Sequence, residues 1–283
     1  MGDAELTATE SIDLTGESGP IIEFKDVTIT FDVKPVLENI SFAVDRGQTL
    51  IILGPAGCGK SVLLKMANGL LRPDSGSIRV FGQEITTMRE RELFKLRAHI
   101  GMVFQESALF DSLTVEDNVA YRLHEERVAE DESHNRVVEA LKFVELEQAI
   151  QKFPAELSGG MRRRVSIARA IITGPDLILY DSPTGGLDPI TSTTIIELVM
   201  KQRDVSHTTS LIVTHRLQDA FIMASHRFDQ KTGGMTPIPK DGPERGLDPG
   251  TKFLVLNDGG IKFHGTTEEL VHSDDPWIKE YLA

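Results

Sequence analysis

Residues 54–61 have the sequence Gly-Pro-Ala-Gly-Cys-Gly-Lys-Ser, which combines residue types that bind phosphate groups. Closely spaced glycines let successive backbone N–H groups point at one anion, the lysine ammonium reaches the outer phosphates of a nucleotide, and the serine hydroxyl suits Mg²⁺. An apolar run at 50–53 precedes the loop, and residues 62–70 after it have helical periodicity. Because a phosphate-binding loop requires this strand-loop-helix context, we predict a nucleoside-triphosphate site. The residues expected to line it are Gly54, Pro55, Ala56, Gly57, Cys58, Gly59, Lys60, Ser61 and Val62.

The composition is that of an ordinary globular protein with an acidic balance. The chain has 283 residues, enough for one large or two small domains, and a formal net charge of −13 at pH 7. This charge disfavours nucleic-acid binding and a peripheral hold on anionic lipid, so we expect no nucleic-acid partner and membrane contact only through another protein. Apolar runs stay below the roughly 20 residues of a spanning helix, and residues 1–5 lack a basic signal-peptide start. We therefore expect a cytoplasmic location.

The first part of the chain is predicted to be rich in strands. Residues 1–20 are polar and acidic without periodicity, and we interpret them as a disordered tail. Apolar and polar residues alternate in 21–31 and 36–44, as in half-buried strands, while 49–53 has the pattern of a buried strand. Residues 75–82 resemble a further hairpin element. These strands suggest a β-rich flap on an α/β core.

The middle of the chain is predicted to be largely helical. Residues 89–97 are highly charged and are interpreted as a helix, and apolar residues recur on one helical face of 136–146. A helical subdomain at about 106–165 would therefore separate the two halves of the α/β core. Continuous apolar runs at 177–181 and 210–214 then predict strands that are buried on both faces of a parallel sheet.

The last part combines an irregular segment with a hairpin. Residues 229–251 contain glycines and several prolines within a polar stretch, and we interpret them as an insertion or flexible loop and not as a folded unit. Apolar runs at 252–256 and 261–264, separated by Asn-Asp-Gly-Gly, predict a hairpin that rejoins the sheet. We expect one α/β domain over 21–283, which ends with this hairpin and a tail at 252–283.

Polar residues and a glycine pair follow the phosphate loop in a fixed order at the ends of predicted elements. Gln105 follows an apolar strand, Leu-Ser-Gly-Gly at 157–160 opens a helix, and Asp181 and His215 each end an apolar strand. With this order the chain resembles the ATPase subunit of ABC transporters, over roughly residues 21–270. The resemblance implies an α/β fold with a RecA-like P-loop NTPase core, an antiparallel β subdomain and a helical subdomain, with ATP and Mg²⁺ as cofactors.

The resemblance implies a role for each of these residues. Gln105 would touch Mg²⁺ or the attacking water and report the nucleotide state to a membrane subunit. Asp181 and Ser61 would help to hold Mg²⁺, which prefers oxygen ligands, and His215 would hydrogen-bond the γ-phosphate. Phe31 lies where the family stacks an aromatic ring on adenine. A core phenylalanine is the alternative for that position.

The resemblance also implies that two copies of the chain enclose two ATP molecules. The Leu-Ser-Gly-Gly segment would present backbone donors at a helix N-terminus to the triphosphate held by the other subunit. The Gly-Leu-Asp segment at 186–188 would belong to the interface loop that couples the two sites. Arg162 and Arg163, which follow the first segment, are interpreted as a solvated helix face, with contacts to phosphate or a partner as the alternative. The interface residues expected at the nucleotide are Ser158, Gly159, Gly160 and Asp188.

One catalytic position, Ser182, departs from the family pattern. Most ABC ATPases have glutamate here, directly after the Mg²⁺ aspartate, where it orients the attacking water. A serine hydroxyl does not accept a proton near neutral pH, and loss of a general base costs about 10² to 10⁴ in rate. Hydrolysis could be slow, with ATP binding doing most of the mechanical work, or His215 or Gln105 could position the water. An engineered change is the third alternative, although a trap more usually carries Gln or Ala; we favour a natural, slower ATPase.

Further motifs are similar to the ATPase subunit of Mla-type, MCE-associated phospholipid transporters. They lie at 105–110, 117–121, 156–164 and in the C-terminal stretch 265–282. This resemblance implies a permease of the MlaE type that docks near the residues after Gln105, an MCE-domain protein in the same complex, and a peripheral place on the inner face of the plasma membrane.

Some alternatives stay open from the sequence. Trp277 and Tyr281 in the C-terminal tail either anchor it on the opposite subunit or pack locally. The chain could serve a transporter for another solute. It could also be an ATP-gated dimerising switch with little hydrolysis.

Overall fold

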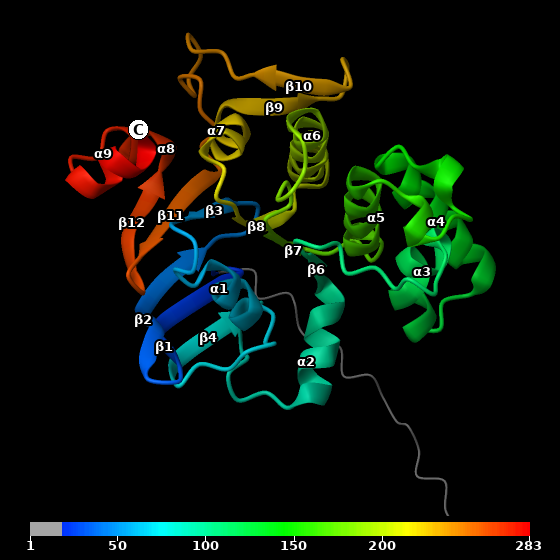
Figure 1. Ribbon diagram of the computed structural model, residues 1–283, viewed down its shortest axis with the longest axis horizontal. Coiled ribbons are helices and arrows are strands. Elements are labelled where there is room, and N and C mark those ends of the chain that lie inside the picture. The colour runs from blue at the N-terminus through cyan, green and yellow to red at the C-terminus, as the bar shows by residue number, and fades with distance from the viewer. Residues whose placement is uncertain (1–18) are drawn as a thin grey trace, which may run out of the picture.

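A six-stranded sheet lies at the centre of the computed structural model, which describes residues 19–283 (Figure 1). Its strand order is β12-β11-β3-β8-β7-β6; β11 to β6 run parallel, and β12 pairs antiparallel with β11. The expected tail at 1–20 lies almost entirely outside the described residues. The strands are β3 (Thr49–Leu53), β6 (Ile100–Val103), β7 (Leu177–Asp181), β8 (Thr209–Val213), β11 (Thr251–Asn257) and β12 (Gly260–Thr266).

Alternate residues of the central strands bury two separate apolar cores. Ile51 and Leu53 of β3 face the core that includes the later helices, whereas Leu50 and Ile52 face the core shared with a second sheet. Because both faces are covered, the strands are continuous apolar runs without alternation, as the sequence predicted for 177–181 and 210–214. This double burial holds the carboxyl ends of the strands in fixed positions.

The second sheet is the expected β-rich flap, with strand order β2-β1-β4-β5. Helix α1 (Lys60–Ala67) lies between the two sheets and buries Leu63, Leu64 and Met66 there. Helix α2 (Glu90–Leu96) matches the prediction for 89–97. The strands are β1 (Ile22–Phe31), β2 (Lys34–Val44), β4 (Ser75–Val80) and β5 (Gln83–Glu84).

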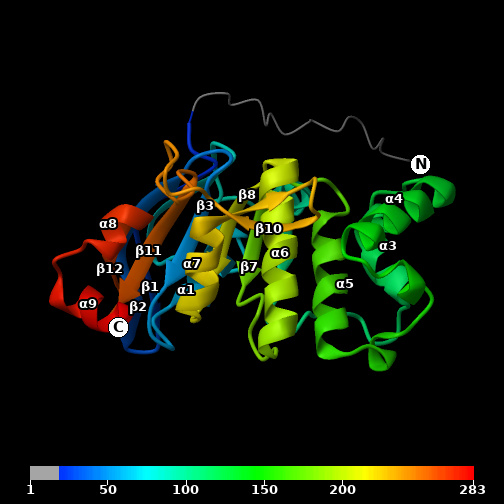
Figure 2. The same cartoon turned by 90° about the horizontal axis from the view of Figure 1, so that it is seen from above.

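Helices α3 to α5 form the helical subdomain, which lies at the opposite end of the molecule from β12 (Figure 2). The subdomain expected at 106–165 ends within α5, and the helix predicted at 136–146 begins earlier and ends at Phe143. None of the helices described is long and apolar enough to cross a membrane. The elements are α3 (Val115–Glu125), α4 (Glu130–Phe143), α5 (Gly159–Ile171), α6 (Pro189–Ser206), α7 (Leu217–Ser225), and the short 3₁₀ helices η1 (Arg97–His99), η2 (Glu147–Ala149) and η3 (Pro154–Glu156).

The segment predicted to be an irregular insertion contains regular structure. Strand β10 (Gly234–Pro237) lies inside it and pairs antiparallel with β9 (His226–Asp229), forming a hairpin beside α6 and α7 (Figure 1). The expectation that 229–251 is not a folded unit is therefore wrong for its first third. Glycines and prolines hid the hairpin, because β10 ends at a proline on the edge of a two-stranded sheet, where proline is tolerated.

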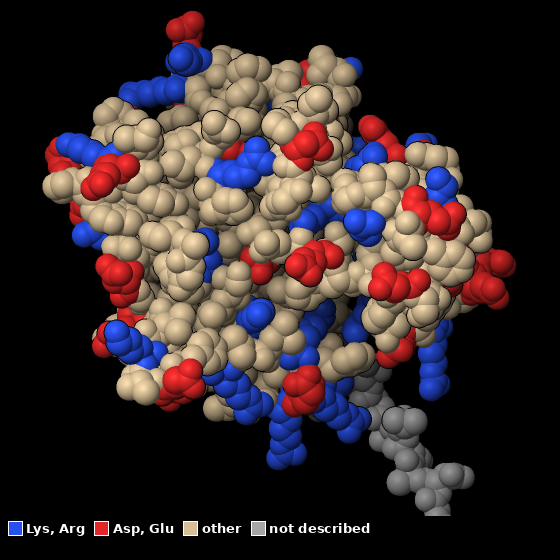
Figure 3. All heavy atoms as spheres, viewed as in Figure 1, with Lys and Arg blue, Asp and Glu red and all other residues tan. Residues whose placement is uncertain are grey.

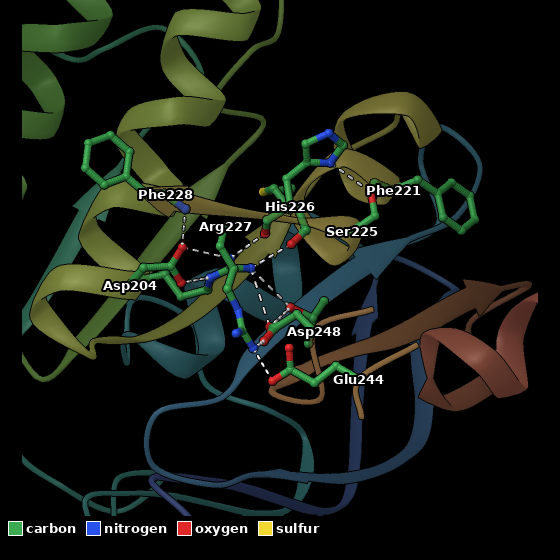
Figure 4. A network of polar contacts seen from close by, with 11 residues as sticks. Asp204, Phe221, Ser225, His226, Arg227, Phe228, Glu244 and Asp248 are labelled. Carbon is green, nitrogen blue, oxygen red and sulfur yellow. Dashed lines mark hydrogen bonds and ion pairs between the residues drawn. The ribbon is translucent and has the colours of Figure 1, made fainter. Parts of the chain in front are cut away.

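A buried arginine of α6, Arg203, anchors the rest of this segment. Figure 4 shows two carboxylates of the same polar network, Asp204 and Asp248. Arg203 donates to the carbonyl oxygens of Met223 at 2.6 Å and His226 at 2.9 Å. It also forms ion pairs with Asp204 at 2.6 Å and Asp248 at 3.4 Å. The backbone N–H of Asp248 in turn donates to a carbonyl of α7. Charge-assisted contacts therefore bind residues near 248 to the body of the protein.

The C-terminal tail packs on its own chain. It consists of α8 (Thr267–Val271) and α9 (Pro276–Leu282). The rings of Trp277 and Tyr281 stack with centroids 5.1 Å apart, and both pack against the core of the same chain. Both residues therefore contact their own chain, and a contact with the opposite subunit stays a prediction.

Candidate functional site

The phosphate loop connects β3 to α1 in a conformation that requires glycine. Gly54 has φ 145°, and a Cβ there would lie 2.3 Å from the carbonyl oxygen of Leu256. Gly59 has φ 98°, and a Cβ there would lie 2.7 Å from Leu37 Cδ2. The ammonium of Lys60 donates to the carbonyl oxygens of Gly54 at 2.8 Å and Pro55 at 2.7 Å. The lysine is thus held over the loop at the N-terminus of α1, a place suited to phosphate.

The loop and the end of β7 meet at two oxygen atoms. The hydroxyl of Ser61 donates to Asp181 Oδ1 at 3.0 Å, although the two residues are far apart in sequence. Asp181 is the last residue of β7 and is buried. A hydroxyl and a carboxylate at this distance provide the oxygen donors that a hard cation such as Mg²⁺ prefers. The donor set therefore fits the metal that the sequence predicted for these two residues.

Ser182 lies in a tight turn directly after β7. It has φ 48° and is 7% exposed. Its N–H donates to the carbonyl of Val213 on β8 at 2.9 Å, and its carbonyl accepts from the N–H of Gly185 at 2.9 Å. The backbone of the residue is thus fixed on both sides, while its side chain carries only a hydroxyl at the position for which the resemblance implies a carboxylate.

Gln105 and His215 come from the strands on either side of β7. Gln105 follows β6 and is exposed, and a Cβ at Gly185 would lie 3.5 Å from its Cγ. His215 follows β8 and is also exposed. Since β6, β7 and β8 are parallel neighbours, their carboxyl ends share one edge of the sheet. The structure thus brings Gln105, Asp181, Ser182 and His215 to the edge where the phosphate loop lies.

Phe31 is exposed at the end of the flap strand β1. Its side chain is 45% exposed, so the alternative that it belongs to the core is wrong. An exposed ring is available for stacking on a flat base. The role in adenine binding remains a prediction.

The Leu-Ser-Gly-Gly segment lies away from the phosphate loop of its own chain. Ser158 is the N-cap of α5 and accepts a hydrogen bond from the N–H of Met161 at 3.2 Å. A Cβ at Gly160 would lie 2.4 Å from Thr191 Cγ2, so this glycine lets α5 approach α6 closely. Both cartoon views separate α5 from α1, with β7 and β8 between them (Figures 1 and 2). Ser158, Gly159 and Gly160 are therefore not brought to residues 54–62 within one chain.

Asp188 caps the helix that follows the Ser182 turn. Its carboxylate accepts from the hydroxyl of Thr191 at 2.5 Å and from the N–H groups of Thr191 and Ile190 at 3.0 and 3.1 Å. These bonds, above all that from the Thr191 hydroxyl, lower the pKa of Asp188. The next apolar side chain, Ile190, is 82% exposed. This corner therefore presents an ionised carboxylate and an apolar side chain to the surroundings.

Sequence reasoning missed two residues that contact the site. Arg163 was expected on a solvated face but is 4% exposed, and it donates to backbone carbonyls of the loops at 104–105 and 182–185. The uncharged run at 165–168 was an available signal, since it indicates a helix that is buried on most sides. The hydroxyl of Tyr281 accepts from the N–H of Gly54 at 3.0 Å, a contact across 227 residues that no local pattern indicates.

Comparison with known proteins places this geometry in a family. Residues 37–185 match the family model described as ABC transporter. The chain belongs to the ABC transporter family. The intermembrane phospholipid transport system ATP-binding protein MlaF of Escherichia coli K12 is 33% identical over 263 residues, which are 93% of this chain and 88% of MlaF. The expected class of enzyme, an ABC-type ATPase, is confirmed.

Other relatives differ in their named solutes. The Mycobacterium leprae protein named "Probable ribonucleotide transport ATP-binding protein mkl" is 40% identical over 93% of this chain and 69% of its own length.

A dimeric ATP-binding cassette solved with ADP and Pi superimposes with a TM-score of 0.72 at 28% identity, over 87% of this chain and 98% of the other. The expected fold class of this ABC ATPase is thus confirmed.

Proposed function

We propose that this chain is the ATP-hydrolysing motor subunit of a membrane transporter, as the phosphate loop and its contact with Asp181 support. In this account Lys60 and the loop amides bind the triphosphate, while Ser61 and Asp181 hold Mg²⁺, and Phe31 stacks on the base. The metal would neutralise charge that develops on the phosphates. Gln105 and His215 would contact the γ-phosphate and its water from the two flanking strands.

We further propose that two copies form the complete site. Within one chain, Ser158 caps a helix that lies on the far side of β7 and β8 from the phosphate loop. A helix N-terminus with exposed Ser158 and Gly159 offers free backbone donors to an anion. The triphosphate bound by a second copy is the ligand that this end would take. The exposed corner at Asp188 and Ile190 would lie in the same contact.

The missing carboxylate at Ser182 makes hydrolysis slow in this proposal. Positioning by Gln105 and His215 would retain part of the rate, because phosphoryl transfer depends mainly on alignment and charge stabilisation. The turn between these two residues is itself fixed by the hydrogen bonds of Ser182 with Val213 and Gly185. ATP binding and dimer closure would then supply most of the mechanical work. A switch that binds ATP but hydrolyses little is the second candidate, and Ser182 is the observation that favours it.

A groove beside residues 104–108, which we call the Gln105 loop, is the proposed docking site of the permease. It measures about 320 Å³ and lies where η1, α3 and α5 approach the loop. The ring centroids of Phe110 and Tyr121 lie 4.7 Å apart, and both side chains are 43% exposed. Asn118 holds the adjoining turn through four hydrogen bonds to Phe110, Leu113 and Thr114. The lining includes Phe104, Phe110, Tyr121, Arg97, Arg122 and Arg169.

These residues suit a short amphipathic helix that carries an acidic residue. The aromatic rings would receive its apolar side chains and the arginines its carboxylate or its last carbonyls. Lys and Arg side chains also gather along the edge over α2 and the four-stranded sheet (Figure 3). We therefore propose a permease of the MlaE type as the partner, with an MCE-domain protein in the complex. The chain would then lie at the cytoplasmic face of the membrane and contact it only through the permease.

Phospholipid is the proposed solute because of the extent of the similarity. The MlaF match spans 93% of this chain and 88% of MlaF. The mkl match spans the same share of this chain but only 69% of mkl, and a methionine import protein, MetN of Rhizobium etli, matches over 70% of this chain and 55% of its own length. The test is co-purification of the full chain with its permease, followed by lipid extraction and mass spectrometry. Bound phospholipid supports the proposal. A complex that carries another solute and no phospholipid contradicts it.

Nucleotide binding tests the proposed ATP site and the proposed dimer, whatever the solute is. We expect the full chain to bind ATP with Mg²⁺ and to form a dimer, measured by calorimetry and light scattering. Lys60→Ala removes the phosphate-loop charge and should abolish both signals, while Lys65→Ala in the last turn of the same helix should retain them. Equal ATP binding by wild type and Lys60→Ala would contradict the assigned site.

A further inference from the structure

Arg163 on α5 contacts three segments of the nucleotide site at once. Its Nη1 donates to the carbonyl oxygens of Phe104 at 2.8 Å and Ser182 at 3.4 Å. Its Nη2 donates to the carbonyl oxygens of Gln105 and Gly185, the latter at 3.3 Å. The guanidinium therefore joins the helix that begins at Ser158, the Gln105 loop and the Ser182 turn.

Stability alone gives little reason for a cation at this position. Arg163 is 4% exposed, and the four groups that receive its hydrogen bonds are neutral backbone carbonyls. Its Nε is buried and has no hydrogen-bond partner among residues 19–283. Burial lowers its pKa, and the nearby carboxylate of Asp181 partly opposes this shift. An apolar side chain of similar volume would avoid the desolvation of both the charge and Nε.

The groove beside the Gln105 loop adjoins the contacts that Arg163 makes with this loop. Phe104 and Ala108 line that groove, and Phe104 is also an acceptor of Arg163. Arg169, one and a half turns further along α5, donates to the carbonyls of Ala108 at 2.7 Å and Ser107 at 2.9 Å. The loop is thus tied to one helix at both of its ends. A shift of the loop must move either α5 or the Ser182 turn.

We propose that Arg163 is a positioning residue that ties the Gln105 loop to the backbone of Ser182 and Gly185, so that the groove and the nucleotide site move together. The inference rests on the proposed transport function, in which a permease helix occupies the groove. A lysine would not replace the arginine, because one nitrogen cannot span carbonyls of both loops. Loss of the Arg163 hydrogen bonds should misalign Gln105 and Ser182 at the edge of the sheet but leave the phosphate loop intact.

The test compares Arg163→Gln and Arg163→Lys with Arg164→Gln in the full chain bound to its permease. Arg164 is the matched control, since it lies on the same helix and also donates to two carbonyls, those of Val144 and Glu145, which lie outside the site. Ser182→Glu serves as the background, because a faster parent makes losses measurable. We expect both Arg163 variants to lower kcat by about 10- to 100-fold, with KM for ATP changed by less than about threefold.

Hydrogen exchange supplies the readout that a merely structural role would not move. Both Arg163 variants should raise amide exchange in 104–108 and in 182–187 together, without nucleotide, while Arg164→Gln raises neither. If Arg163→Gln does not fold, Arg163→Lys retains the charge and most of the volume and decides the matter. A kcat within about threefold of the parent, or faster exchange in only one of the two segments, overturns the proposal. If the parent hydrolyses no ATP, the transport function fails, and hydrogen exchange still decides the role of Arg163.

Discussion

Restoring the family carboxylate, Ser182→Glu, should accelerate ATP hydrolysis strongly. Ser182 already occupies a left-handed turn with φ 48°. Neither serine nor glutamate is branched at Cβ, so the backbone strain at this position is about the same for both residues. The position is 7% exposed and next to Asp181, so a second carboxylate there costs about 1–2 kcal/mol of folding free energy. A domain with a stability of about 10 kcal/mol tolerates that loss. A general base contributes about 10² to 10⁴ in rate, which is about 2.7–5.4 kcal/mol of barrier.

The assay is phosphate release in single and multiple turnovers, with the permease present. Ser182→Gln is the matched control, because it has the shape of glutamate without a basic oxygen, and it should remain as slow as wild type. Ser182→Ala should also change little relative to a slow wild type. Brisk wild-type turnover, equal to that of Ser182→Glu and unaffected by Ser182→Ala, would refute the reasoning about the missing base.

Three further substitutions test other contacts. Tyr281→Phe removes the acceptor of the Gly54 N–H and should weaken ATP binding by about 3- to 10-fold in a calorimetric titration; unchanged affinity would show that the contact does not support the loop. Ser158→Arg should abolish ATP-dependent dimerisation in light scattering while one chain still binds ATP, and a dimer that persists would contradict the proposed interface. Arg203→Met should lower the free energy of unfolding by about 2–4 kcal/mol, because Asp204 loses its ion pair at 2.6 Å and Asp248 keeps only the longer pair with Arg227 at 4.0 Å, with ATP binding retained. A denaturant titration with an unchanged midpoint would contradict that anchoring role.

Elements with a strong local pattern were predictable from the sequence. The phosphate loop was identified because its glycines, lysine and serine occur between an apolar run and a helical pattern, and the structure has β3 and α1 there. The strands at 177–181 and 209–213 and the hairpin of β11 and β12 followed from apolar runs and turn residues. The resemblance implied that Ser61 and Asp181 both hold Mg²⁺, and the structure brings their oxygen atoms to 3.0 Å; the metal role itself stays a prediction.

Features that depend on distant residues were not predictable in this way. The hairpin of β9 and β10 was missed because its prolines and glycines break the strand pattern, while its neighbour Asp248 is held by Arg203 of another element. Arg163 was misjudged because it was interpreted as part of a solvated helix face, whereas α5 buries Arg163 together with residues 165–168 and Ala170. The contact of Tyr281 with Gly54 joins the two ends of the domain. Each of these depends on the tertiary arrangement and not on local periodicity.

Steady-state ATP turnover by the full chain with its permease, beside Lys60→Ala, tests the central claim most directly. We expect slow but measurable phosphate release by wild type, because the phosphate loop, Ser61 and Asp181 are assembled while the general base is absent. We also expect Lys60→Ala to remove this release. Turnover that is the same in Lys60→Ala, or an absence of both ATP binding and turnover in wild type, would contradict the account.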